Sequence, residues 1–161
     1  MKRYYEMRSF SWRGLIVFAC LSISLLAGCG DGIHRVDITG VLTAQKKPID
    51  GAVVQLLPKG STTGDGGLGA VDSEGKFTVI SSRQDDPGIP PGTYTVLVSR
   101  LVDENGTLLP KDAGQADYPD GFDSIPPPYS TRNSPLEITV TDEDRTFEID
   151  IPVALRTSQR R

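Results

Sequence analysis

Hydrophobic and polar residues alternate in short runs along most of the chain after residue 30. Seven such runs, rich in valine, isoleucine, threonine or aromatic residues, predict β-strands at 36–43, 52–58, 70–72, 76–81, 93–102, 136–140 and 146–151. Turn-forming stretches such as 61–69 and 85–92 separate them. No stretch past residue 30 keeps a helical period, and the 12 prolines and 17 glycines of the chain disfavour one. The pattern is typical of an all-β sandwich or barrel.

Alternate positions of these runs form an apolar set that we expect to be the core. It comprises Ile38, Leu42, Val54, Leu56, Phe77, Val79, Tyr94, Val96, Val98, Leu136, Ile138, Val140, Phe147, Ile149 and Ile151. The intervening residues are mostly polar, so each sheet is expected to have one face toward water. Two sheets packed face to face, about 10 Å apart, would bury the apolar set.

The N-terminus has a different pattern. Residues 1–14 are basic, and residues 15–27 form an apolar run of 13 residues, which also contains Cys20. A membrane-spanning helix needs about 20 apolar residues, so this run is too short for a permanent span. A basic start followed by a short apolar run is the pattern of a secretory signal peptide.

The run ends in Leu26-Ala27-Gly28-Cys29, which resembles the lipobox of bacterial lipoproteins. This resemblance implies that residues 1–28 are removed, that Cys29 carries the lipid (palmitate-type acyl chains), and that 29–35 form a tether. Two or three acyl chains are enough for stable anchoring. Because Gly30 rather than aspartate follows Cys29, the outer membrane or cell surface is favoured over the inner membrane. An ordinary secreted protein is the alternative.

The remaining 133 residues are enough for one domain, and they carry a net charge of −7 with His34 neutral. An acidic domain does not suit nucleic acid, which requires a basic face. Residues 153–161 form a basic tail that we expect to be solvated. With Cys29 lipidated, no disulfide is available, so packing alone must hold the domain.

Four motifs in the predicted domain carry a second resemblance: ITGVLT, KKPIDGAVV, DSEGKFTV and PPGTYTVLV. In this order and spacing they resemble the carboxypeptidase regulatory-like domain, which belongs to the transthyretin (prealbumin)-like class. The resemblance implies a seven-stranded antiparallel Greek-key β-sandwich over residues 36–152. Such domains are usually structural, adhesive or carbohydrate-associated modules, so the resemblance implies no activity.

Catalytic and metal-binding candidates are few. His34 is the only histidine and lies in the predicted tether, so the sequence has no Ser–His or Cys–His pair. The paired histidines of the hydrolases and dioxygenases in this sandwich class are missing as well. We therefore expect neither an enzyme nor a cofactor. Asp117, Asp120 and Asp123 are weak calcium candidates, since aspartates at turns usually bond their own backbone.

The segment 103–134 is too long for an ordinary connection and has no convincing strand, apart from a small hairpin expected around Asn105-Gly106. It carries the aromatic residues Tyr118, Phe122 and Tyr129. Exposed aromatics beside carboxylates suit sugar binding; the alternative, which we favour, is that these side chains cap an open end of the sandwich.

Together these patterns predict a lipid-anchored, non-catalytic module of the bacterial cell envelope with a structural or interaction role. Its partners would be the membrane, through the lipid, and an envelope glycan or protein. The alternative is a carbohydrate- or peptide-binding accessory lipoprotein that uses the 103–134 loop. An enzyme is a remote alternative.

Overall fold

The computed structural model describes residues 32–82, 88–110 and 117–158, and in these ranges the chain forms strands and turns but no helix. No described segment therefore has the helical length and hydropathy of a membrane span. Cys29 lies outside the described residues. The strands are β1 (Ile38–Ala44), β2 (Lys47–Pro48), β3 (Val53–Pro58), β4 (Gly67–Ala70), β5 (Lys76–Ser81), β6 (Gly92–Ser99), β7 (Leu101–Val102), β8 (Phe122–Asp123), β9 (Glu137–Val140) and β10 (Thr146–Ile151).

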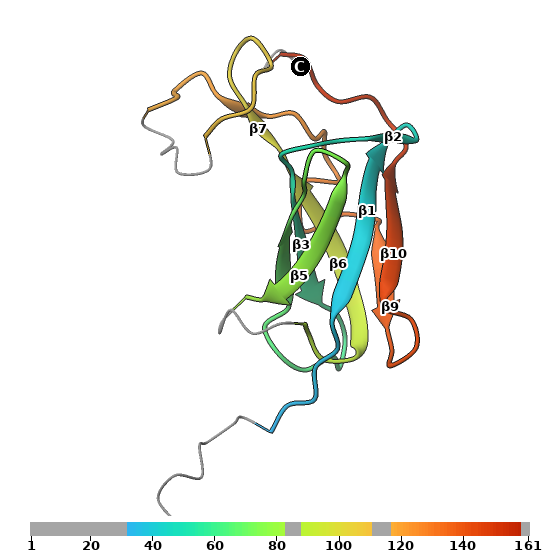
Figure 1. Cartoon of the computed structure of the whole chain (residues 1–161). Helices are drawn as coiled ribbons and strands as arrows, with labels where there is room; N and C mark the ends of the chain where they lie inside the picture. Colours follow the sequence, from blue (N-terminus) through green and yellow to red (C-terminus); the bar gives the residue numbers. More distant parts are fainter. Residues whose placement is uncertain (1–31, 83–87, 111–116, 159–161) are drawn as a thin grey trace, which may run out of the picture. The chain divides into compact units, whose positions relative to one another are not determined.

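One continuous sheet contains most of these strands, in the order β10-β1-β5-β4-β3-β6-β9, with β2 paired to β1. Neighbours are antiparallel except β1 and β10, which are parallel. The consecutive strands β9 and β10 lie at opposite ends of this order, yet only residues 141–145 join them. The sheet therefore curls back around its own core, as Figure 1 shows. Two sheets packed face to face were expected; the structure has the sandwich-like layers, but they are joined into one curled sheet where β4 pairs with β5.

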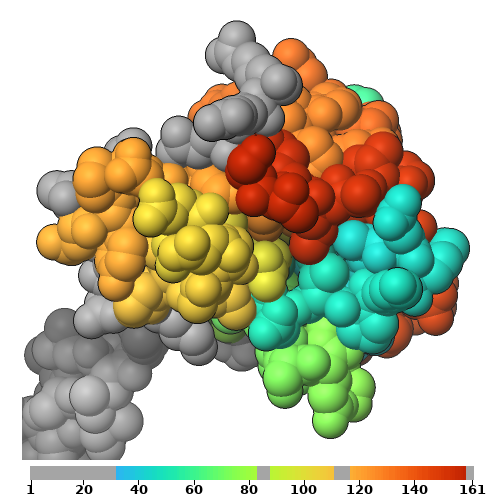
Figure 2. All heavy atoms as spheres, turned by 90° about the horizontal axis from the view of Figure 1, so that it is seen from above, coloured from blue at the N-terminus to red at the C-terminus, as the bar shows by residue number. Residues whose placement is uncertain are grey.

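The sheet has two ends, named here from their positions in Figure 1. The lower end comprises residues 34–37, 59–66, 88–91 and 141–145. The upper end comprises the turns after β1, β4 and β6, residues 117–135 and the C-terminal segment 152–158. Figure 2 looks down on the upper end, where 101–110, 117–135 and the C-terminal segment lie side by side.

The predicted core is confirmed for most of its members. On β6, Tyr94, Val96 and Val98 are fully buried while the intervening residues are half-buried, so the expected two-residue period holds. Leu136, Ile138 and Phe147 are only partly buried, because they lie on or next to β9 and β10, where the sheet ends. The core also contains residues that no strand pattern predicts. These are Ile49, Ile89 and Ile125, which lie in connections.

Residues 61–69 were expected to form a loop, and this is wrong for 67–69, which belong to β4. Gly67 and Gly69 point inward, where a Cβ would lie 2.4 Å from Val79 Cγ1 and 3.1 Å from Phe77 Cδ2, respectively. The glycines thus let β5 side chains pass under β4 at the corner of the sheet. Leu68, between them, points outward and is 37% exposed.

The run 93–102 was expected to be one strand, and it is interrupted at Arg100. The Arg100 amide donates to Asp123 Oδ1 at 3.0 Å instead of continuing the β6 ladder. The next two residues form β7, which pairs with β8. Segment 103–134 therefore does contain a strand, contrary to expectation. Its predicted small hairpin is confirmed by the bridge between Val102 and Leu108.

Tyr94 joins the start of β6 to the connection that precedes it. Its ring is fully buried, and its hydroxyl donates a 2.6 Å hydrogen bond to the Pro90 carbonyl, which is also buried. Burial raises the pKa of the Tyr94 hydroxyl to about 12. This bond fixes the chain where it crosses from β5 to β6 at the lower end.

Tyr94→Phe is expected to lower the free energy of unfolding by about 1–3 kcal/mol, because the buried Pro90 carbonyl loses its donor. A pH series provides a second test. Since the folded pKa is above the unfolded value near 10, the phenol's contribution is fully present below pH 10 and is lost as the pH rises toward 12. Chemical denaturation should show wild type losing up to about 3 kcal/mol relative to Tyr94→Phe over this range. If the free energies of unfolding of wild type and Tyr94→Phe changed with pH in parallel, the burial of the Tyr94 hydroxyl would be contradicted.

Candidate interaction surface

Apolar side chains gather on the outer face of β3, β4 and β5, where the sequence pattern predicted a polar face. Val53, Leu68 and Ile80 are 42%, 37% and 41% exposed, respectively. Leu68 is directly opposite Ile80 in the β4–β5 pair, and Val53 is opposite Ala70 in the β3–β4 pair. This expectation of a polar outer face is therefore wrong for these strands. Exposed large apolar residues that are neighbours point to a binding surface more than scattered ones do.

These residues line a broad groove of about 820 Å³ that crosses the outer face. Its lining residues are Thr39, Gly40, Val41, Val53, Leu68, Ala70, Asp72, Lys76, Phe77, Thr78, Ile80 and Thr146. A second hollow, of about 380 Å³, adjoins it at the upper end and shares Val53 and Ala70 with it. The two hollows form one continuous surface, which we call the apolar groove.

The hairpin 101–110 forms the wall of the upper hollow. Leu101 is 52% exposed, whereas its neighbour Val102 is fully buried and bridges to Leu108. Leu108 lies against the backbone at Gly51, where a Cβ would be only 2.4 Å from Leu108 Cδ1. Gly51 also has a φ of +65°, so the turn before β3 requires a glycine for two independent reasons. Together these contacts hold the hairpin against the start of β3.

Few charges border the apolar groove: Asp72 and Lys76 are the only charged residues in its lining. Asp72 Oδ1 accepts hydrogen bonds from the amides of Glu74 and Lys76, at 2.8 and 2.9 Å, and so shapes the turn before β5. The hydrogen bond from Lys76 Nζ to Glu74, with the charge of that carboxylate, raises the pKa of Lys76. The groove is thus an almost uncharged face of an acidic domain.

The aromatic residues predicted as binding candidates lie at the upper end. Phe122 is 7% exposed, and the Arg156 guanidinium carbon lies 5.7 Å from its ring centroid. Tyr129 packs against the core, and its carbonyl accepts a 3.0 Å hydrogen bond from the Val98 amide. Tyr118 is half-buried. Tyr129 therefore packs on the core, whereas Phe122 is buried next to Arg156 and is not part of the core cluster.

The weak calcium candidates are not brought together as a ligand set. Asp123 Oδ1 accepts from the backbone amides of Arg100 and Ile125, at 3.0 and 2.9 Å, and so fastens the loop to the end of β6. Asp117 and Asp120 are exposed. Across the described ranges, no group of three or more histidine, cysteine, aspartate or glutamate side chains could hold a metal ion.

Arg156 belongs to the tail that was expected to be solvated, and for this residue the expectation is wrong. Its amide donates to the Ser124 carbonyl at 2.7 Å, and its guanidinium donates to the Asp123 carbonyl at 3.4 Å. The half-buried Leu155 packs against the core beside it. The start of the tail therefore belongs to the folded domain. Composition alone does not reveal this, because a basic hexapeptide also fits a free end.

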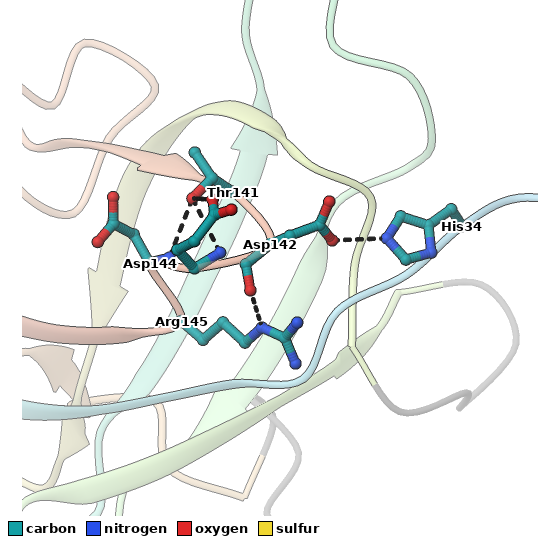
Figure 3. Close-up of polar contacts among 6 residues, drawn as sticks. His34, Thr141, Asp142, Asp144 and Arg145 are labelled. Carbon is teal, nitrogen blue, oxygen red and sulfur yellow. Dashed lines mark hydrogen bonds and ion pairs between the residues drawn. The ribbon is translucent and has the colours of Figure 1, made fainter.

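At the lower end, the segment before β1 meets the turn between β9 and β10 (Figure 3). His34 Nε2 lies 2.7 Å from Asp142 Oδ1, and both side chains are exposed. The hydrogen bond with His34 lowers the pKa of Asp142. The turn is built locally: the Thr141 hydroxyl accepts from the amides of Glu143 and Asp144, and Arg145 Nε donates to the Asp142 carbonyl. Sequence reasoning missed this contact, since its residues are 108 positions apart.

Comparisons with protein-family models, with curated proteins and with solved structures find no match for this chain.

Proposed function

We propose that this chain is a lipid-anchored, non-catalytic module of the bacterial cell envelope that acts by binding a partner at its surface. The observation that carries the binding role is the apolar groove, where Val53, Leu68 and Ile80 are exposed side by side on strands whose other faces form the core. A face kept apolar without packing against its own chain is typical of an interaction site.

The anchoring rests on the tetrapeptide Leu26–Cys29 at the end of a 13-residue apolar run. In this proposal Cys29 is the lipidated N-terminus of the mature protein. The glycine that follows it favours the outer membrane or cell surface. A thiol alkylated next to the bilayer and two or three acyl chains would give stable attachment without a spanning helix.

The proposal includes a specific fold, the prealbumin-like Greek-key sandwich of carboxypeptidase regulatory-like domains. The bond from the Tyr94 hydroxyl to Pro90 supports it, since a tyrosine early in a strand that bonds backbone a few residues upstream is a corner device of Greek-key sandwiches. Strands of the main path of the sheet overlap all seven ranges expected from the sequence, although the range 70–72 shares only Ala70 with β4.

The loop-based alternative, a carbohydrate- or peptide-binding protein that uses residues 103–134, has less support. Sugar stacking needs aromatic faces open to solvent. Phe122 is instead buried beneath Arg156, and Tyr129 packs on the core. The part of this segment that contributes to a surface is its hairpin, where Leu108 and Leu109 line the upper hollow of the apolar groove.

Replacing Cys29 with serine tests the anchoring. A serine hydroxyl cannot accept the thioether-linked lipid, so we expect the variant to remain unprocessed and to lose its lipid-dependent retention. The measurement is fractionation of wild type and Cys29→Ser in high salt, with processing followed by apparent size. Cys20→Ser is the matched control and should behave as wild type. Processed Cys29→Ser protein that still sediments with membranes would contradict the lipoprotein assignment.

A further inference from the structure

The segment before β1 is held against the lower end of the sheet by backbone hydrogen bonds at Val36. The Val36 amide donates to the Ile89 carbonyl at 2.9 Å, and the Ile89 amide donates back to Val36 at 3.1 Å. Val36 is 3% exposed. Gly88, with a φ of +77°, brings its backbone so close that a Cβ would lie 2.2 Å from the Val36 carbonyl oxygen. These contacts hold the segment that precedes β1 against the body of the domain.

A second attachment lies two residues earlier. The 2.7 Å contact between His34 and Asp142 ties this segment to the turn between β9 and β10 (Figure 3). If Cys29 carries the lipid, only residues 30–33 separate it from His34. A fully extended chain spans at most about 18 Å from Cys29 to His34 and about 25 Å from Cys29 to Val36.

We propose that the lower end of the sheet faces the membrane and that the upper end, with the hairpin 101–110, points away from it. This inference rests on the proposed lipidation of Cys29. The eight residues of β6 run from the lower to the upper end and cover about 26 Å. The upper hollow of the apolar groove is thereby held clear of the lipid headgroups, where a partner in the surrounding compartment can reach it.

Charge argues against the domain lying flat on the membrane. The mature chain has a net charge of −7, and Asp142, Glu143 and Asp144 are all exposed at the lower end. An anionic headgroup layer repels these carboxylates, so the lower end does not insert into the bilayer, while the short tether keeps it next to the headgroups. The apolar groove has one cation in its lining, Lys76, whereas surfaces that bind membranes combine apolar residues with several basic ones.

Fluorescence quenching by lipid tests this orientation on the lipidated full-length mature protein. A lipidated Cys29 has no free thiol, so a single introduced cysteine accepts a thiol-reactive fluorophore. Three exposed positions report on three surfaces: Thr63→Cys on the lower end, Asn105→Cys on the upper end and Thr78→Cys in the apolar groove. The probe is an anionic vesicle that contains a lipid with a nitroxide headgroup.

We expect a loss of fluorescence at position 63 and none at position 105 or 78 relative to vesicles without nitroxide. Quenching at 105 or 78 equal to that at 63 would overturn the orientation. His34→Ala in the Thr63→Cys background should reduce the quenching, since it removes the attachment of this segment to Asp142; unchanged quenching would contradict the role of the His34 contact. If Cys29 is not lipidated, the result is different: the protein without an introduced cysteine would react with the fluorophore at Cys29 and would not stay bound to the vesicles.

Discussion

Gly66→Ala is expected to destabilise the domain by at least about 3 kcal/mol, which is a large part of the stability of an ordinary domain. Gly66 has a φ of +78°, and a Cβ there would lie 1.9 Å from the Leu56 carbonyl oxygen. The methyl group would meet the backbone of β3 at its pairing with β4, and a backbone carbonyl cannot move aside as a side chain can. Thermal and denaturant unfolding of the soluble fragment 32–161 measure the effect.

Gly60→Ala is the matched control for this substitution. Gly60 lies in the same connection between β3 and β4 and has a φ of +64°, but nothing lies within 4 Å of a Cβ built there. Gly60→Ala should therefore lower the free energy of unfolding only by the cost of the left-handed backbone conformation, about 1–2 kcal/mol. If Gly60→Ala and Gly66→Ala lowered the free energy of unfolding equally, the close approach of Gly66 to β3 would be contradicted.

Leu56→Ala is expected to cost about 2–5 kcal/mol, because it removes a fully buried side chain and leaves a cavity. Leu56 lies on β3, which pairs with β4 on one side and β6 on the other, so the backbone around it has little freedom to collapse. The denaturant midpoint of the same fragment gives the comparison, provided that the slope of the transition is unchanged.

Leu68→Ala removes the same atoms from the outer face and serves as the control. Leu68 is 37% exposed in the apolar groove, so its truncation should cost about 1 kcal/mol or less. A small loss at Leu68 would also mean that folding does not require the exposed leucine. A loss as large as that at Leu56 would contradict the inward and outward assignment of β3 and β4.

Strand positions could be predicted from the sequence where a two-residue period coincides with one buried face. The ranges 76–81 and 146–151 match β5 and β10 residue for residue, because β-branched and aromatic residues occupy the inward positions Phe77, Val79, Ile149 and Ile151. The inward set of β6 was predicted for the same reason. The turn at Asp72–Gly75 contains residue types that are typical of a hairpin turn, and Gly75 has the positive φ that such a turn requires.

The errors occur where a contact distant in sequence decides the structure. Residues 67–69 were expected to form a loop because glycines weaken a strand pattern, yet β4 pairs with β3 and β5 because those glycines leave room for Phe77 and Val79. Asp123 ends β6 by capturing the Arg100 amide, and nothing near position 100 indicates this. Tertiary context, not local preference, fixed both boundaries.

The candidate surface was the least predictable feature. Aromatic composition directed attention to Tyr118, Phe122 and Tyr129, but composition does not show which way a loop side chain faces. Val53 and Ile80 lie at outward positions of predicted strands, and Leu68 lies in a stretch that was expected to be a loop, so the sequence did not indicate that the three share one exposed face. The strand pairing places Leu68 beside Ile80 and Val53 beside Ala70 on one outer face, and the sequence alone does not give this pairing.

Intact mass measurement of the protein extracted from membranes tests the central proposal of a lipid-anchored module most directly. A mature chain that begins at Cys29 and carries a diacylglycerol-type adduct on that residue is the expected result. Digestion should place the added mass on the peptide that contains Cys29 and on no other. A chain that still begins at Met1, or one cut elsewhere with an unmodified thiol at Cys29, would contradict the proposal.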